Sequence, residues 1–110
     1  MKLRTLLIAA AGLTLAVGAA GAASAETPWQ AHHPRRVEVN HRLERQNHQI
    51  RAERREGDLT AAQARRLHER DHMIRMQERR FARHDRGHLT RREQVRLNHR
   101  ENVVHRHIPA

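Results

Sequence analysis

Several residue types that build stable cores or reactive sites are scarce in this chain. Its 110 residues include no cysteine and no tyrosine, one tryptophan, one phenylalanine and three prolines. The absence of cysteine excludes disulfides, thiol catalysis, cysteine-attached haem and cysteine-ligated zinc. The shortage of aromatic side chains removes the stacking platforms with which proteins bind single-stranded nucleic acid. The sequence is therefore that of one small domain without covalent cross-links.

Positive charge dominates what is present. Lysine and arginine number 22 against 12 aspartate and glutamate residues, which gives a formal net charge of +10, and there are 11 histidines. After Ala25 the chain contains arginine but no lysine. Guanidinium groups bind carboxylates and phosphates bidentately, which lysine does not do. The composition favours anionic partners, although a genome rich in G and C would also enrich arginine without any function.

Residues 1–25 have the design of a secretory signal peptide. Lys2 and Arg4 form a positive start, residues 6–17 are mostly apolar, and the small-x-small triplet 23–25 precedes Glu26. A membrane anchor is the alternative, but the segment is rich in alanine and glycine, and nothing later is apolar enough to span a bilayer. We expect a protein of a Gram-negative periplasm or a secreted protein, with no membrane span and no access to intracellular nucleic acid.

A short motif, G-x-L-T-x-x-[EQ], occurs twice with an offset of 30 residues. The two copies are Gly57, Leu59, Thr60 and Gln63, and Gly87, Leu89, Thr90 and Glu93. Glycine suits the left-handed residue that ends a helix, and threonine followed three residues later by glutamine or glutamate forms a capping box. Each copy therefore predicts the end of one helix, a tight turn and the start of the next.

These signals predict an all-α fold of three antiparallel helices, at 36–56, 61–86 and 91–105, within a repeat domain of residues 36–108. Residues 26–35 are expected to form a flexible N-terminal arm. The apolar positions of the helices follow seven-residue spacings: Leu43 and Ile50; Leu67, Ile74 and Phe81; Leu97 and Val104. Such narrow stripes are typical of a helix–helix seam. They predict a thin core that a homodimer would reinforce.

The repeated motif resembles one in a known family. The segment 59–63, Leu-Thr-Ala-Ala-Gln, fits the L-T-x-x-Q motif of the Spy and CpxP type of periplasmic stress chaperones, and 89–93 is a near match. The tandem motif behind a signal peptide also resembles a group of small, basic, secreted proteobacterial proteins, over about residues 36–108. In Spy-like proteins the two copies lie further apart, so this chain resembles a shortened relative. The resemblance implies a helical envelope chaperone that is metal-free or metal-responsive.

A histidine pair on the central helix predicts a metal site. His68 and His72 have the i, i+4 spacing at which two imidazoles share one ion, and a helical wheel places both towards solvent. Asp71 offers an oxygen ligand, while Met73 and Met76 offer soft donors of the kind that Cu(I) prefers. Copper or zinc is the expected ion, and solvated surface histidines are the alternative.

Two further motif matches lead to no activity. His68, Glu69 and His72 fit H-E-x-x-H, but a chain this small has no second domain to form a substrate cleft. The glycine turns resemble the end of an EF-hand loop, but Arg54 and Arg86 stand where calcium needs carboxylates. We therefore expect no enzymatic activity and no required cofactor.

The combined features favour a non-enzymatic, exported envelope-stress or chaperone-like protein that binds partly unfolded or anionic envelope components. One alternative is a periplasmic protein that binds copper or zinc, and another is an arginine-rich structural protein that binds polyanions. Many arginines are expected to pair with acids on their own helix, as Arg75 with Glu78. The many histidines predict helices that loosen between about pH 7 and pH 5.

Overall fold

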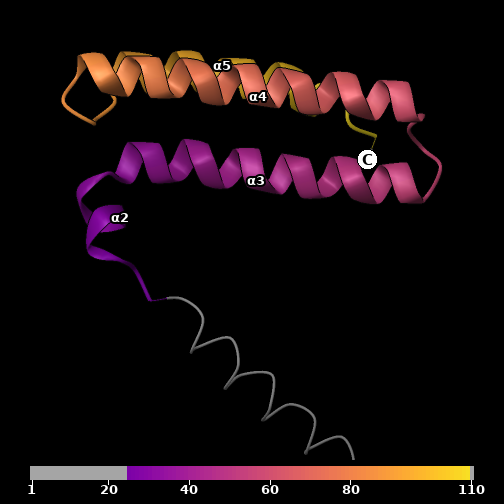
Figure 1. Ribbon diagram of the computed structural model, residues 1–110, viewed down its shortest axis with the longest axis horizontal. Helices are drawn as coiled ribbons and strands as arrows, with labels where there is room; N and C mark the ends of the chain where they lie inside the picture. Colours follow the sequence, from indigo (N-terminus) through magenta and orange to yellow (C-terminus); the bar gives the residue numbers. More distant parts are fainter. Residues whose placement is uncertain (1–24, 110) are drawn as a thin grey trace, which may run out of the picture.

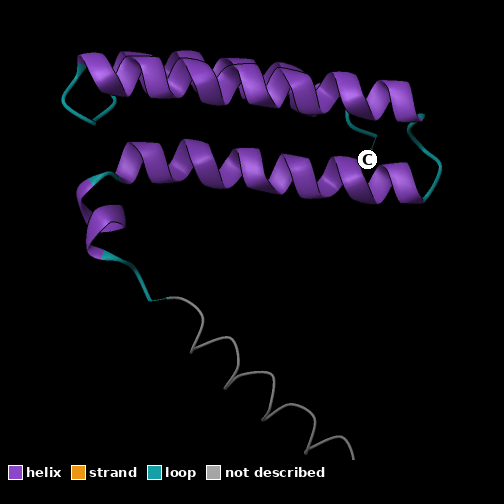
Figure 2. Cartoon of the chain, viewed as in Figure 1, coloured by secondary structure: helices purple, strands orange, loops and turns teal. Residues whose placement is uncertain are grey.

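The computed structural model describes residues 25–109, so the predicted signal peptide lies outside the described residues except for Ala25. Four helices follow one another: α2 (Pro28–His32), α3 (Pro34–Arg55), α4 (Ala61–His84) and α5 (Arg91–Arg106). The described part of the chain contains no strand, which confirms the all-α prediction (Figure 2). Within the same residues no helix is both long enough and apolar enough to cross a membrane.

The two turns between the long helices have the geometry that the repeated motif predicts. Gly57 has φ +86° and Gly87 has φ +90°, in the left-handed region where a residue without a Cβ is least strained. Thr60 Oγ1 accepts a hydrogen bond from the backbone N–H of Gln63 at 3.1 Å, and Gln63 Oε1 accepts one from the Thr60 N–H at 2.8 Å. An equivalent capping box opens α5. Each turn therefore ends one long helix and leads into the next (Figure 1).

The helix boundaries differ slightly from the expected ones. The helix α4 ends at His84, because Asp85 and Arg86 have left the helical conformation, with Arg86 at φ +53°. The helix α3 begins two residues earlier than expected, at Pro34, whose fixed φ suits the first turn of a helix.

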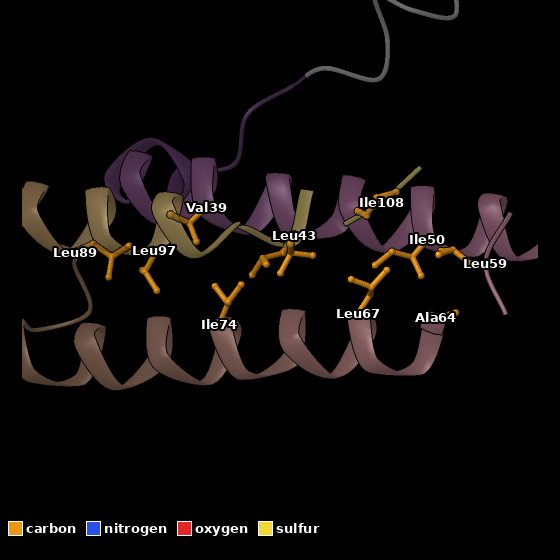
Figure 3. Close-up of a cluster of buried hydrophobic side chains, with 11 residues drawn as sticks. Val39, Leu43, Ile50, Leu59, Ala64, Leu67, Ile74, Leu89, Leu97 and Ile108 are labelled. Atoms are coloured by element: carbon orange, nitrogen blue, oxygen red, sulfur yellow. The ribbon is translucent and has the colours of Figure 1, made fainter. Parts of the chain in front are cut away.

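The three long helices enclose one continuous hydrophobic cluster, and each of them packs against the other two (Figure 3). Its members come from all three helices, both turns and the C-terminus: Val39, Leu43, Ile50, Leu59, Ala64, Leu67, Ile74, Leu89, Leu97, Val104 and Ile108. Phe81 is partly buried against this cluster. The motif residues Leu59 and Leu89 thus fix the turns to the core as well as shaping them.

The segment expected to be an irregular arm contains the short helix α2. Thr27 and Gln30 form a capping box at its start, of the same kind as those of α4 and α5. The indole of Trp29, a residue of α2, stacks on the imidazole of His33, with ring centroids 4.5 Å apart. The imidazole of His33 in turn stacks on that of His88, with ring centroids 4.6 Å apart. Since His88 belongs to the turn between α4 and α5, this column of rings joins the N-terminal segment to that turn, at the end of the bundle where α3 begins (Figure 1).

Candidate functional site

Most arginines of the bundle have no carboxylate partner among the described residues. Arg36 pairs with Glu78, Nε to Oε2 at 2.6 Å, and Arg42 Nη1 lies 4.0 Å from Glu101 Oε1. The other arginines of residues 25–109 lie more than 4.0 Å from every carboxylate oxygen in that range. The expected pair of Glu78 with Arg75 is absent there, because Glu78 points into the interface with α3, where 1% of its side chain is exposed. The cationic surface is therefore largely uncompensated.

Most of the large apolar side chains, in contrast, are buried. The large hydrophobic side chains that remain exposed within the described chain are Trp29, Met73 and Val95. Of the expected seam residues, six are buried and Phe81 is half-buried. A partner that approaches this fold therefore meets guanidinium groups before it meets the hydrophobic seam.

Four arginines lie together where α3 ends and α4 begins. Arg51, Arg54 and Arg55 of α3 and Arg65 of α4 line a groove of about 530 Å³ between the two helices. Further lining residues are Ala61, Ala64 and His68. We call this feature the arginine groove. The turn between α3 and α4, beside this groove, lies at the opposite end of the bundle from the turn between α4 and α5, which holds His88 (Figure 1).

Besides Glu78, which pairs with Arg36, each of the three long helices buries one polar side chain inside the bundle. Gln46 of α3, Asp71 of α4 and Glu101 of α5 have 3%, 1% and 0% of their surface exposed. Gln46 Nε2 donates a hydrogen bond to the backbone oxygen of Glu101 at 2.8 Å. Both carboxylate oxygens of Asp71, both of Glu101 and the Gln46 Oε1 atom have no hydrogen-bond partner among the described residues. We call these three residues, two acids and the amide of Gln46, the buried acid layer.

The buried acid layer binds protons much more readily than ordinary carboxylates. Burial raises the pKa of Asp71 to about 7, against the opposing effect of the Arg75 charge. Burial likewise raises the pKa of Glu101 to about 8; Arg42 and Arg45 act against this rise, while Glu38 and Asp71 add to it. Desolvation dominates because a buried carboxylate loses its hydration and gains no hydrogen bond in return. Both groups therefore titrate near neutral pH.

The structure separates the residues of the predicted metal site. Asp71 was expected beside His68 and His72 at the surface, but it lies in the core, because it occupies the position between Leu67 and Ile74 on the packed stripe of α4. Asp71 is buried while His72 is exposed, so this conformation does not bring the two side chains to one surface, and a ligand role for Asp71 stays a prediction.

The two histidines also differ from each other. His68 was expected to face solvent but is half-buried, with its Nδ1 2.7 Å from Asn47 Oδ1 on α3. Burial, and then the charge of Arg51, lower the pKa of His68. Of the sulfur donors, Met73 is exposed and Met76 is half-buried. His68, His72 and the methionines remain a predicted metal site.

Acidic oxygens meet elsewhere, in the first turn. Glu53, Glu56 and Asp58 bring ligand atoms within 4.8 Å of one another. A side-chain hydrogen bond with Asp58 raises the pKa of Glu53, with smaller contributions from burial and from the charges of Glu56 and Asp58. These acids interact with one another, and none of them lies within 4.0 Å of an arginine nitrogen in the described chain.

The sequence interpretation missed the buried polar residues Gln46, Glu78 and Glu101. The signal that locates them is the alternating spacing of three and four residues, as in 39, 43, 46 and 50 of α3 and 97, 101 and 104 of α5. Comparison of the chain with protein-family models, with curated proteins and with solved structures finds no match.

Proposed function

We propose that this protein is an exported, non-enzymatic binding protein that holds partly unfolded, acidic polypeptide segments in the manner of an envelope-stress chaperone. The observation that carries the proposal is the uncompensated arginine surface: two ion pairs for the arginines of residues 25–109. Unpaired guanidinium groups bind carboxylates with charge-assisted hydrogen bonds. The signal-peptide pattern of residues 1–25 supports export.

Recognition in this proposal begins with charge. The seam is buried, so the initial complex with a client forms between guanidinium and carboxylate groups at the surface. Charge attraction brings oppositely charged partners together quickly and depends on ionic strength. The exposed side chains of Trp29, Met73 and Val95 then supply limited apolar contact.

The proposal includes a finer architecture, three antiparallel helices that pair as a homodimer. The mutual packing of α3, α4 and α5 supports the bundle, and the small size of its core supports pairing. Light scattering coupled to size-exclusion chromatography measures the mass of the particle in solution. A monomeric mass at micromolar concentration contradicts the homodimer.

The test of the function is suppression of aggregation with two clients of opposite charge. We expect the mature protein to keep a heat-unfolded acidic client soluble and to have little effect on a heat-unfolded basic client of similar size. Equal protection of both clients contradicts the proposal, because it requires recognition through apolar surface.

An arginine-rich polyanion-binding protein is the second candidate, and the same unpaired arginines favour it. The two functions differ in their response to inorganic polyphosphate. If polyphosphate binds tightly while the acidic client is not protected, the polyanion function replaces the chaperone-like one.

A further inference from the structure

The arginine groove combines four like charges with a hollow. Arg51, Arg54 and Arg55 share one face of α3, since residues three and four apart are neighbours on a helix surface. Arg65 faces them from the second turn of α4. Alanines at 61 and 64 leave the space between these long side chains open, because their side chains are single methyl groups.

No acidic side chain of the described residues neutralises these four arginines. Each lies more than 4.0 Å from every carboxylate oxygen in residues 25–109. The nearest acids along the chain, Glu53 in the last turn of α3 and Glu56 and Asp58 after it, are grouped with one another. Like charges at helical neighbour spacing repel, so the groove is a place where an anion relieves an unfavourable interaction.

We propose that the arginine groove is a binding site for a phosphate monoester, either free or carried as the headgroup of an amphiphile. Guanidinium forks match phosphate oxygens in bidentate geometry, and four of them line one shallow hollow that is open to solvent. A volume of about 530 Å³ falls in the range of small-molecule sites and holds more than a bare phosphate. The methyl groups of Ala61 and Ala64 contact the organic part of the ligand. The site rests on the same unpaired arginines as the proposed function, but it specifies a separate ligand.

The experiment compares two variants that lose the same charge. Arg54→Gln with Arg65→Gln removes one groove arginine from each helix. Arg80→Gln with Arg96→Gln removes two exposed arginines that do not line the groove. Both pairs lie at the surface, and circular dichroism checks that each variant is helical. Arg54→Lys keeps the charge and loses the fork, which separates bidentate binding from simple attraction.

The probes are glycerol 1-phosphate, inorganic phosphate, and phosphatidylcholine vesicles with and without phosphatidic acid, all at constant ionic strength. Phosphorus NMR titration measures the soluble ligands and co-sedimentation measures the vesicles. We expect the groove variant to bind at least about tenfold more weakly than the wild type, and the control variant to bind within about twofold. Binding of the soluble ligands identifies the free form, and binding only of vesicles with phosphatidic acid identifies the headgroup.

Equal weakening in the groove and control variants overturns the proposal, since the anion then responds to net charge alone. Absence of binding to every probe also overturns it. Protection of an acidic client is measured in the same variants, so that the two ideas fail separately: a client effect without phosphate binding removes only the groove site.

Discussion

Replacing Glu101 by glutamine should stabilise the protein in alkaline solution and change little in acid. The wild-type carboxyl is fully buried, and neither of its oxygens has a hydrogen-bond partner among the described residues. Arg42, at 4.0 Å, is the cation that partly compensates its charge. Glutamine has nearly the same shape and does not ionise, so the substitution removes the buried charge and keeps the packing.

The size of the effect follows from the raised pKa. In the unfolded chain this carboxyl titrates near its ordinary value of 4.5, and in the folded chain near about 8. The folded state therefore holds the proton more tightly, and this contribution to stability is complete below about pH 4.5 and is lost as the pH rises through about 8. Each unit of pKa corresponds to about 1.4 kcal/mol, so the loss is several kcal/mol. A domain of this size has a total stability of about 5 to 10 kcal/mol.

Two neighbouring effects set the rest of the profile. Asp71, whose pKa is about 7 in the folded chain, adds to the loss of stability with rising pH. The lowered pKa of His68 acts in the opposite direction: its contribution is present above the ordinary value of 6.5 and is lost as the pH falls below that value. The acid loosening expected from the histidines is therefore opposed by the buried acid layer.

Urea denaturation followed by circular dichroism, near pH 5 and near pH 9, measures how the free energy of unfolding depends on pH. We expect the unfolding free energy of the wild type to be lower near pH 9 than near pH 5, and Glu101→Gln to remove about half of this difference, because the contribution of Asp71 remains. Glu69→Gln, at an exposed position of the same bundle, is the matched control and should leave it intact. A wild-type protein that is as stable near pH 9 as near pH 5 refutes the reasoning.

Three further predictions concern other parts of the chain. Gly57→Val forces a β-branched residue to φ +86°, with no neighbouring atom in the way, and should lower the unfolding free energy by about 1 kcal/mol or more; an unchanged melting temperature contradicts the turn geometry. Arg36→Gln removes the cationic partner of the buried Glu78 and leaves it the Asn40 Nδ2 donor at 3.4 Å, so it should destabilise the fold by about 3 kcal/mol near neutral pH, measured by urea denaturation; an unchanged unfolding free energy shows that the ion pair is dispensable. If His68 and His72 bind zinc or copper, the double variant His68→Ala, His72→Ala should lose most of the heat measured by calorimetric titration, and equal titrations place the metal elsewhere.

The turns were predictable because their information is local. A glycine at the end of a helix and a threonine three residues before a glutamine each act within one turn of backbone. The sequence Thr27-Pro28-Trp29-Gln30 carries the same capping signal for α2, in a segment where the nearby prolines suggested an irregular arm. That helix was predictable from the same rule.

The buried acid layer was harder to predict because the core stripe was sought among apolar residues alone. In α4 the packed positions are 64, 67, 71, 74, 78 and 82, and polar side chains occupy two of them. With the polar positions 71 and 78 disregarded, seven residues separate Leu67 from Ile74, and Asp71 between them is assigned to the surface. The raised pKa values depend further on how α3, α4 and α5 meet, which involves contacts between residues far apart in sequence.

The abundance of arginine could be predicted from the sequence, but the position of the arginine groove could not. The sequence shows that arginine is abundant, and local spacing suggests pairs with acids on the same helix. In the structure Glu78 instead pairs with Arg36 on another helix. The arginines around Ala61 and Ala64 have no carboxylate within 4.0 Å among the described residues. Which cations stay uncompensated is a property of the packed bundle.

The salt dependence of binding to an unfolded, glutamate-rich peptide tests the central claim most directly. Fluorescence anisotropy across a series of sodium chloride concentrations gives the dissociation constant at each. If unpaired arginines carry recognition, the affinity falls steeply with added salt, by about tenfold or more between low and physiological ionic strength. An affinity that stays constant or increases with salt contradicts the claim, because it places recognition on apolar surface.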